Sequence, residues 1–369
     1  MSSSLVSITT ELMRFRSSAS NPSELRKIVD FSCAYLKKIP GVEVLRYESL
    51  GKPSLVASFE KSKRPEVALV GHLDIVEVEK KHDLLLPCLR GRRLIGRGAA
   101  DMRGGVAVFF EVMKYFSRFA KRPSLALMLS TDEEIGGYDG MGYLTKTQKY
   151  RPRIALIPDS GLAINSIVRG EKGALHIKVS ARGLESHGAE PWDGENAIEL
   201  LFDARDRMCE LLAIENYPAG RRWIETINIG TIHGGTSVNK VPSHAEMKCD
   251  IRFTEKYTAR TLLKLLQKNI PFCRIEQIMD AEVTAYDPKH PLRKLYKRVL
   301  EKEIGKMAKF VWEHGNSDGR FFTKGGTTVI VHSPTGGKIH DYNEWIGLKS
   351  QEQYLNILKA YIHEVGYPH

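Results

Sequence analysis

Cysteine is sparse in this chain, and long apolar runs are absent. The 369 residues include five cysteines, Cys33, Cys88, Cys209, Cys249 and Cys273, which are widely spaced and form no CxxC pair. A disulfide framework and a cysteine zinc site are therefore not expected, and a cytoplasmic location fits this usage. No run reaches about 18 apolar residues, so no transmembrane helix is predicted. The N-terminal sequence MSSSLVSITTELMRF also lacks the basic and apolar regions of a secretory signal.

A continuous basic stripe is absent as well, although basic residues outnumber acidic ones. The formal net charge is +11, from 55 lysines and arginines against 44 aspartates and glutamates. The basic residues form short clusters at 61–64, 90–93 and 221–222, without interleaved aromatics. We interpret this charge as a solvated basic surface that can draw anionic substrates towards a cleft. No nucleic-acid partner is predicted, and a nucleic-acid binder stays the third alternative.

The hydrophobic pattern predicts an α/β fold that a second domain interrupts. Continuous apolar runs at 66–74, 125–131 and 153–160 are typical of strands covered on both faces. From about residue 166 to 283 the pattern becomes strand, helix, strand, strand, helix, strand, with alternating apolar and polar residues in the strands. We therefore predict a discontinuous domain, residues 1–165 and 284–369, with a mixed, mainly parallel central sheet flanked by helices. Residues 166–283 are predicted to form an inserted ferredoxin-like α+β domain of βαββαβ order.

Two helices are predicted in the first part of the chain. Residues 21–39 carry apolar side chains at helical spacing, and Asn21 and Glu24 can form a capping box around Pro22 at the first helical position. Residues 104–120 are apolar on nearly all sides, which predicts a helix buried against the sheet.

Histidine and carboxylate side chains lie just after several of the predicted strands or in glycine-rich segments. The set consists of His72, Asp74, Asp101, Glu133, Glu134, Asp159 and His340. Because open α/β sheets bind ligands beyond the carboxyl ends of their strands, these side chains can converge. Nitrogen and oxygen donors without thiolate suit zinc, cobalt or manganese.

Each of these residues also has a structural interpretation when it is considered alone. Asp101 could cap the helix predicted at 104–120, and Glu133 and Glu134 could form a solvated acidic turn. A lone histidine such as His340 is more often structural. Their coincidence at several strand ends nevertheless favours a carboxylate-bridged metal site.

Eight short motifs, in order along the chain, resemble those of the M20 family of zinc amidohydrolases and metallopeptidases. They are GHLD, GRGAADMRGG, STDEEIGG, IPDSG, GLESHGAEPWDGENAI, GGTSVNKVP, SDGRFF and GGKIHDYNE. The resemblance covers essentially the whole chain. It implies a dinuclear metal-dependent hydrolase that cleaves an amide bond of an N-acyl amino acid, as deacylases and desuccinylases do. An M20 dipeptidase or carboxypeptidase acting on short peptides is the alternative.

The resemblance assigns a role to each matching residue of the catalytic domain. The expected ligands of two divalent metal ions, zinc with cobalt or manganese as alternatives, are His72, Asp101, Glu134, Asp159 and His340. Asp101 would bridge the ions, Asp74 would orient His72, and Glu133 would be the general base that activates a metal-bridging water. Family members also lead us to expect a cis peptide bond between Asp101 and Met102.

The inserted domain of this family usually acts as a lid and forms a dimer interface, so a homodimer is expected, with no membrane partner. His187 would reach the active site of the partner subunit and stabilise the oxyanion, and Asn239 would contact the same oxygen or a substrate carboxylate. The expected substrate-binding cations are Arg252, Arg320 and Lys172, although each arginine could instead serve a structural ion pair.

Two departures argue against a strict desuccinylase. Asn316 precedes SDGR where that branch tends to carry threonine, and the turn at 171–174 reads EKGA where the branch has Arg-Arg-Gly-Ser. A succinyl carboxylate requires positioned basic and hydroxyl groups, of which Lys172 keeps one.

Overall fold

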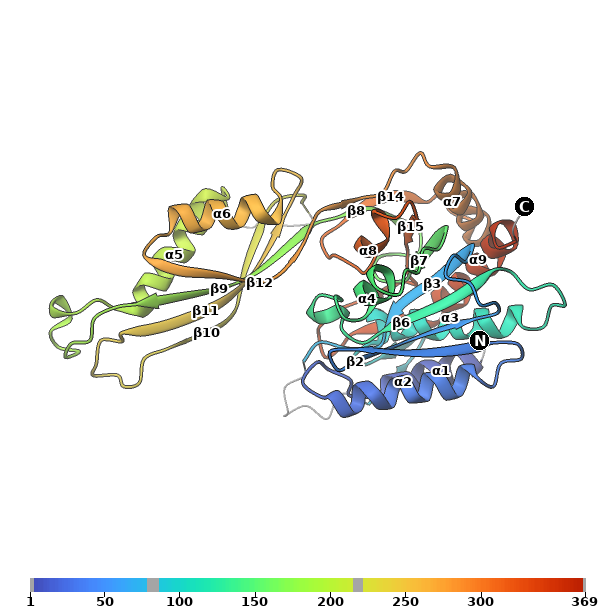
Figure 1. Ribbon diagram of the computed structural model, residues 1–369, viewed down its shortest axis with the longest axis horizontal. Helices are drawn as coiled ribbons and strands as arrows, with labels where there is room; N and C mark the ends of the chain where they lie inside the picture. Colours follow the sequence, from blue (N-terminus) through green and yellow to red (C-terminus); the bar gives the residue numbers. More distant parts are fainter. Residues whose placement is uncertain (1–2, 78–85, 215–221, 368–369) are drawn as a thin grey trace. The chain divides into compact units, whose positions relative to one another are not determined.

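The computed structural model describes residues 3–77, 86–214 and 222–367 (Figure 1). The chain forms two compact units. Unit 1 comprises Met1–Gly170, Ala285–Glu313 and Ser317–His369, and unit 2 comprises Glu171–Thr284 and His314–Asn316. The assignment of catalysis to one domain and of dimerisation to the other stays a prediction.

A six-stranded sheet forms the centre of unit 1. Its order is β1 (Glu43–Ser49), β2 (Lys52–Ser58), β6 (Leu125–Ser130), β3 (Val67–His72), β7 (Ile154–Ile157) and β15 (Thr328–Val331). The neighbours β6, β3, β7 and β15 run parallel, whereas β1 and β2 are joined antiparallel at one edge. Every residue of β3, β6 and β7 is buried, as expected of strands covered on both faces. The predicted mixed, mainly parallel sheet is therefore confirmed.

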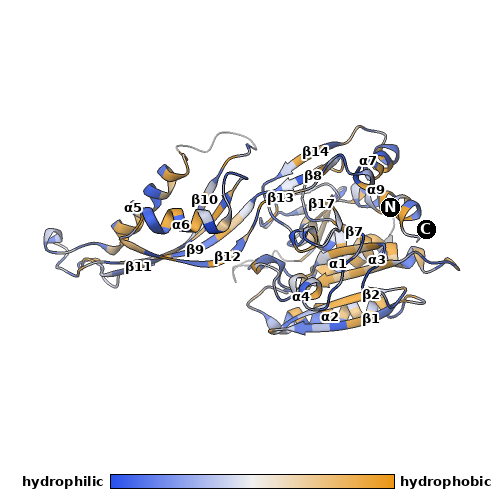
Figure 2. Ribbon diagram, turned by 45° about the horizontal axis from the view of Figure 1, so that its top comes forward, coloured by the Kyte–Doolittle hydropathy of each residue, from blue (hydrophilic) through white to orange (hydrophobic). Residues whose placement is uncertain are grey.

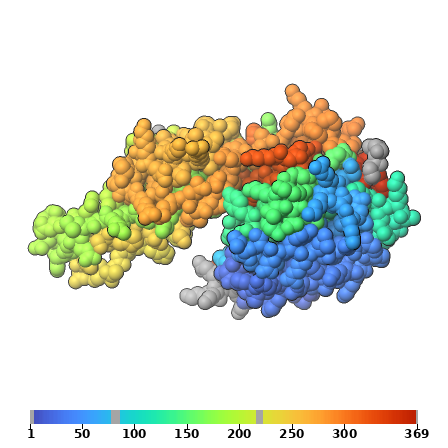
Figure 3. Space-filling model, in the orientation of Figure 1, coloured from blue at the N-terminus to red at the C-terminus, as the bar shows by residue number. Residues whose placement is uncertain are grey.

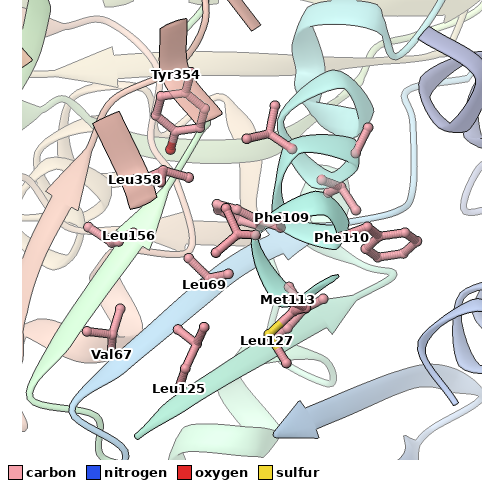
Figure 4. Packing of buried hydrophobic residues seen from close by; sticks show 14 of the residues in the cluster. Val67, Leu69, Phe109, Phe110, Met113, Leu125, Leu127, Leu156, Tyr354 and Leu358 are labelled. Carbon is pink, nitrogen blue, oxygen red and sulfur yellow. The ribbon is translucent and has the colours of Figure 1, made fainter. Parts of the chain in front are cut away.

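Helices cover both faces of this sheet. They are α1 (Ser3–Met13), α2 (Pro22–Leu36), α3 (Gly104–Phe116), α4 (Met141–Lys146), α7 (Pro291–Ile304), α8 (Arg320–Thr323) and α9 (Leu348–Val365). On one face, Phe109 and Met113 of α3 and Leu358 of α9 pack with Leu69 and Leu127 of the sheet (Figure 4). On the other face, side chains of α4 and α8 pack against the remaining apolar residues of the same strands.

The burial of α3 follows from its composition. Ten of its 13 residues are buried, including Phe109, Phe110 and Phe116, and the helix lies against β3, as predicted, and also against α9. Each large apolar side chain that leaves water completely contributes about 1.5–3 kcal/mol. The helix that follows the Asp101 turn is thus held firmly against one face of the sheet.

Two details of the predicted helices are wrong. Asn21 stands before α2, but its side chain caps no backbone N–H and instead accepts the hydroxyl of Ser23, at 3.0 Å. Glu24 does not close a capping box because its carboxylate accepts Lys27 Nζ and the backbone N–H of Arg16. In addition, α1 was not predicted, and α3 ends at Phe116 rather than near residue 120.

A small sheet of short strands lies beside the central one in unit 1. Its order is β16 (Gly336–Gly337), β17 (Trp345–Gly347), β5 (Arg93–Ile95) and β4 (Cys88–Arg90). The pairing of β17 with β5 brings the segment after His340 next to the segment before Asp101. Three further short strands are β8 (Ser166–Glu171), β13 (Thr284–Ala285) and β14 (Lys309–Glu313).

Unit 2 contains a four-stranded antiparallel sheet with two helices on one face. Its elements are β9 (Gly173–Arg182), α5 (Ala197–Leu211), β10 (Thr226–Gly234), β11 (His244–Phe253), α6 (Ala259–Asn269) and β12 (Cys273–Ala281). The sheet order is β10-β11-β9-β12. Leu175, Ile177 and Val179 of β9 belong to the core that packs against the helices. The ribbons of α5 and α6 carry both hydrophobic and hydrophilic residues (Figure 2). The chain order of strands and helices is the βαββαβ order expected from the sequence.

The surface of unit 1 includes much of the N-terminal segment, which is blue in the space-filling view (Figure 3). None of the helices in the described residues combines the length and the apolar composition that a membrane span requires.

Candidate metal centre

The predicted metal-type residues gather at the carboxyl edge of the central sheet. His72 is the last residue of β3, Asp159 follows β7 by two residues, and Glu133 and Glu134 form a short 3-10 turn after β6. Because β3, β6 and β7 are adjacent and parallel, their carboxyl ends open onto the same crevice.

His72 is held between two carboxylates. Its Nε2 lies 3.1 Å from Oδ1 of Asp101, and its Nδ1 lies 3.2 Å from the carbonyl oxygen of Asp74 and 3.4 Å from Oδ1 of Asp74. The side chains of His72 and Asp74 are 1% and 0% exposed. Burial opposes the charge, but the contacts with Asp101 and Asp74 outweigh it and raise the pKa of His72 well above its usual value. When Nδ1 donates to Asp74, Nε2 can offer its lone pair to a metal ion.

His340 approaches the other oxygen of the same aspartate. Its Nε2 lies 3.2 Å from Oδ2 of Asp101 and 3.4 Å from Oε2 of Glu134. Burial would lower the pKa of His340, but the contacts with Asp101 and Glu134 raise it to about 10. Burial would likewise raise the pKa of Asp101, but hydrogen bonds with His340 and His72 hold it well below its usual value. The two oxygens of Asp101 therefore face two different histidines.

Glu134 completes a cluster around Asp101. The nearest ligand atoms of His72, Asp101 and Glu134 all lie within 4.8 Å of one another. Oε1 of Glu134 accepts the backbone N–H of Val76 at 3.1 Å, which leaves Oε2 towards His340. Burial first, and then the charge of Asp101, raise the pKa of Glu134 to about 7.

Glu133 lies in a second cluster. Its carboxylate, His72 and Asp159 offer ligand atoms that also lie within 4.8 Å of one another. Burial raises the pKa of Glu133, and the nearby charges of His72 and Arg320 act in the opposite direction. The geometry thus brings both glutamates to the centre.

The donor set fits divalent metal ions. The carboxylates of Asp101, Glu133, Glu134 and Asp159 offer ligand atoms around His72, and His340 contacts Asp101 and Glu134. Such a concentration of negative charge favours bound cations. Imidazole nitrogens with carboxylate oxygens are the ligands that zinc, cobalt and manganese accept.

The backbone around Asp101 has an unusual path. Asp101 lies in a π-helical turn, Ala99–Arg103, in which its own φ and ψ are −122° and 92°. It is not the N-cap of α3, a place that Arg103 takes. The Asp101–Met102 peptide bond is cis, as expected. The guanidinium of Arg103 is fully buried and donates to the carbonyl oxygens of Leu12 and Leu73, which anchors this turn to the end of β3.

Two buried aspartates beside the turn of Glu133 were not predicted. Oδ2 of Asp132 accepts the backbone N–H groups of Asp139 and Gly140, and Oδ2 of Asp318 accepts the hydroxyl of Ser130. Burial raises the pKa of Asp132 to about 7, and burial with the charge of Glu133 raises the pKa of Asp318. Asp132 lies in the motif STDEEIGG and Asp318 in SDGRFF, so their positions within these motifs are the signal that could have identified them.

Arg320 lies beside the proposed base in unit 1. Its Nη1 is 4.0 Å from Oε1 of Glu133, and its Nη2 donates to the carbonyl oxygen of Gly136 at 2.7 Å. The guanidinium thus joins the loop after Glu133, and a role in substrate binding stays a prediction.

His187 and Asn239 are neighbours in unit 2. Both side chains are exposed, and the backbone N–H of Gly188 donates to the carbonyl oxygen of Asn239 at 2.8 Å. The Nδ1 of His187 accepts the N–H of Ala189 at 3.1 Å. The two residues predicted to contact the same oxygen therefore lie close together in unit 2.

The two other predicted cations of unit 2 have protein partners. Nε of Arg252 lies 2.8 Å from Oδ1 of Asp250, as the alternative of a structural ion pair foresees. The side chain of Lys172 is buried, donates to the carbonyl oxygen of Ile224 and lies over the ring of Trp223.

The fold and the cluster of histidines and carboxylates are those of a metal-dependent hydrolase. Residues 68–364 match the model of Peptidase family M20/M25/M40, and the chain belongs to this family. It is therefore a hydrolase that acts on amide or peptide bonds, which confirms the predicted family and enzyme class.

Similar proteins differ in the substrates that their names state. The succinyl-diaminopimelate desuccinylase of Xylella fastidiosa (strain M23) is 28% identical over 321 residues, which cover 81% of this chain and 83% of that protein. The M20 family metallo-carboxypeptidase of Sulfolobus solfataricus has a TM-score of 0.82 at 16% identity, covering 98% of this chain and 99% of that chain. Human carnosine dipeptidase 1 has a TM-score of 0.80 at 14% identity, covering 98% and 96%. The two structures share the fold.

Proposed function

We propose that this chain is a dinuclear metal-dependent hydrolase that cleaves the amide bond of an N-acyl amino acid. The observation that carries the proposal is the position of Asp101, whose Oδ1 faces His72 and whose Oδ2 faces His340. A carboxylate between two nitrogen donors is suited to bridge two cations that would otherwise repel each other.

The ligands divide between two ions around this bridge. His72, Asp101 and Asp159 would hold one ion, and Asp101, Glu134 and His340 would hold the other, with zinc as the first choice. Bound ions supply Lewis-acid polarisation of the scissile carbonyl and of water. Asp74 would keep His72 in the tautomer that has a proton on Nδ1, since Nδ1 faces its carbonyl and carboxylate oxygens.

Glu133 would move the proton. It stands in the cluster with His72 and Asp159, and its raised pKa brings it closer to neutral pH, where a general base and acid works best. Glu133 would accept a proton from the attacking water and return it to the nitrogen of the leaving amine. His187 of a second subunit would donate a hydrogen bond to the tetrahedral oxyanion.

The amino-acid product has a carboxylate, which a cation should recognise. Asn239 and Arg252 are the proposed contacts in unit 2, and Arg320 is the proposed contact in unit 1. The 28% identity with desuccinylases supports an N-acyl substrate. The burial of the Lys172 ammonium among protein groups favours the second candidate, a dipeptidase or carboxypeptidase that needs no cation for a succinyl group.

A substrate panel tests this proposal. N-acetyl and N-succinyl amino acids and a set of dipeptides are assayed with zinc, cobalt or manganese added separately. We expect hydrolysis of at least one N-acyl amino acid with a kcat/KM above that for any dipeptide. A higher value for a dipeptide would transfer the proposal to the second candidate, and metal-independent turnover would overturn both.

A further inference from the structure

The carboxylate of Glu344 is fully buried and surrounded by N–H donors. Oε1 accepts the backbone N–H groups of Ala100 and Asp101, at 2.7 and 2.9 Å. Oε2 accepts the backbone N–H of Gly98 at 3.0 Å and Nη1 of Arg97 at 3.4 Å. Because both oxygens have these partners, the carboxylate of Glu344 faces the backbone of the Asp101 turn and not the imidazole rings of His72 and His340.

Glu344 also connects the segment that carries Asp101 with the segment that carries His340. The backbone N–H of Gly96 donates to the carbonyl oxygen of Glu344 at 2.8 Å, next to the pairing of β5 with β17. Arg97, which contacts Glu344, also donates from Nη2 to the carbonyl oxygen of His340 at 2.8 Å. The Asp101 turn and the His340 loop are thus connected through one carboxylate and one guanidinium.

The turn before α3 needs such a partner. Gly98 has a φ of 80°, in the left-handed region, and Asp101 has non-helical dihedral angles inside a π-helical turn. Regular helical hydrogen bonds therefore do not satisfy the N–H groups of Ala100 and Asp101, and buried backbone donors without a partner are unfavourable. A carboxylate that accepts the backbone N–H groups of Gly98, Ala100 and Asp101 stabilises this one path of the chain.

We infer that Glu344 is a positioning residue of the metal centre, which holds the backbone of Asp101 so that its two carboxylate oxygens point to His72 and to His340. The inference rests on the proposed metal centre. Outer residues that orient metal ligands typically change metal affinity or activity by about 10- to 100-fold when they are replaced. Neither Glu344 nor Arg97 belongs to the predicted set. Apart from their contact with each other, their partners are backbone groups, which sequence motifs do not reveal.

The test combines a metal-free measurement with metal binding in the variant Glu344→Gln. The amide retains the size of the side chain but directs an NH2 group at N–H donors, so we expect hydrogen exchange at residues 97–102 of the metal-free protein to accelerate at least tenfold. We also expect metal affinity, measured by chelator competition, to fall about 10- to 100-fold. The visible spectrum of the cobalt-loaded protein should change as well.

Glu111→Gln is the matched control, because Glu111 is a partly buried carboxylate of α3 that accepts the hydroxyl of Ser4 and takes no part in the centre. It should leave exchange and affinity unchanged. A folded Glu344→Gln protein with wild-type exchange and wild-type metal affinity would overturn the inference.

Two further variants keep the outcome interpretable. If Glu344→Gln does not fold, Arg97→Gln removes one donor to Glu344 and the bond to the His340 carbonyl, and metal affinity should still fall, towards about tenfold; a wild-type affinity would overturn the inference. Asp101→Asn tests the proposed function separately. If that variant kept the full metal content, the centre itself would be wrong, whatever the exchange of Glu344→Gln.

Discussion

Asp101 is the residue on which the chemistry of this chain depends. It contacts a histidine with each of its oxygens, and both histidines have raised pKa values that favour their protonated forms. In the metal-free chain, two protons therefore supply part of the positive charge that ions would supply. Metal binding should release these protons, since imidazole binds metal through its neutral form.

The first prediction concerns the pH dependence of the metal-free protein. His340 has a pKa raised from 6.5 to about 10, so its contribution to the free energy of unfolding is complete below pH 6.5 and is lost as the pH rises through about 10. The pKa of Glu134 is raised from 4.5 to about 7, so this residue also lowers the free energy of unfolding as the pH rises from about 4.5 to about 7. Urea unfolding at pH 5, 7 and 9 should show decreasing stability. An equal slope in His340→Ala would contradict this explanation.

The second prediction separates the base from the ligands. Glu133→Ala should keep two bound metal ions and lose activity by about 10²–10⁴-fold, the usual contribution of general acid–base catalysis. Metal analysis beside kinetics checks both parts, with Glu111→Ala as a control of similar size in α3. A variant that keeps a tenth of the wild-type rate, or that loses an ion, would show that Glu133 is not the base proposed here.

At the scale of elements, long apolar segments were the predictable part of the fold. The strands β3, β6 and β7 and the helix α3 are continuous apolar runs, because they are covered on both sides. The strands of unit 2 were predictable from their alternation of apolar and polar residues, because only one face of their sheet is covered.

Short elements and backbone-directed contacts could not be predicted. The strands β4, β5, β16 and β17 have two or three residues each, too few for a periodicity. Asp101 could be predicted as a member of the metal centre because it lies in the motif GRGAADMRGG. The role of Glu344 depends on N–H groups of a turn that lies far away in the sequence, and only the three-dimensional path of the chain brings them together.

The third prediction concerns the support of the site by α3. Phe109 is fully buried between the central sheet and α9, so Phe109→Ala should lower the free energy of unfolding by about 3–5 kcal/mol through lost burial and a cavity. Leu50→Ala is a suitable control because Leu50 is 87% exposed. Urea unfolding of the two variants provides the measurement, and similar small effects in both would contradict the assigned core.

At the scale of the whole molecule, the proposal implies that residues of two subunits form each active site. The fourth prediction follows from the proposed role of His187 across a homodimer. Inactive His187→Ala and Glu133→Ala subunits, once mixed and exchanged, should regain roughly a quarter of wild-type activity, because half of the dimers are mixed and each carries one complete site. If mixed dimers form and remain inactive, His187 does not act in trans. A chain that stays monomeric would also exclude this arrangement.

The net charge of +11 belongs to the same scale. It is compatible with attraction of carboxylate-bearing substrates towards the centre, an effect that weakens as salt screens the field.

The most direct test of the account is the location of the metal ions themselves. Crystals of the zinc-loaded protein are measured with anomalous diffraction at the zinc edge, and Asp101→Asn is treated in the same way. The account predicts two zinc ions per chain, with the Asp101 carboxylate between them, His72 on one and His340 on the other, and loss of at least one ion in Asp101→Asn. A single ion, or two ions that Asp101 does not bridge, would contradict it.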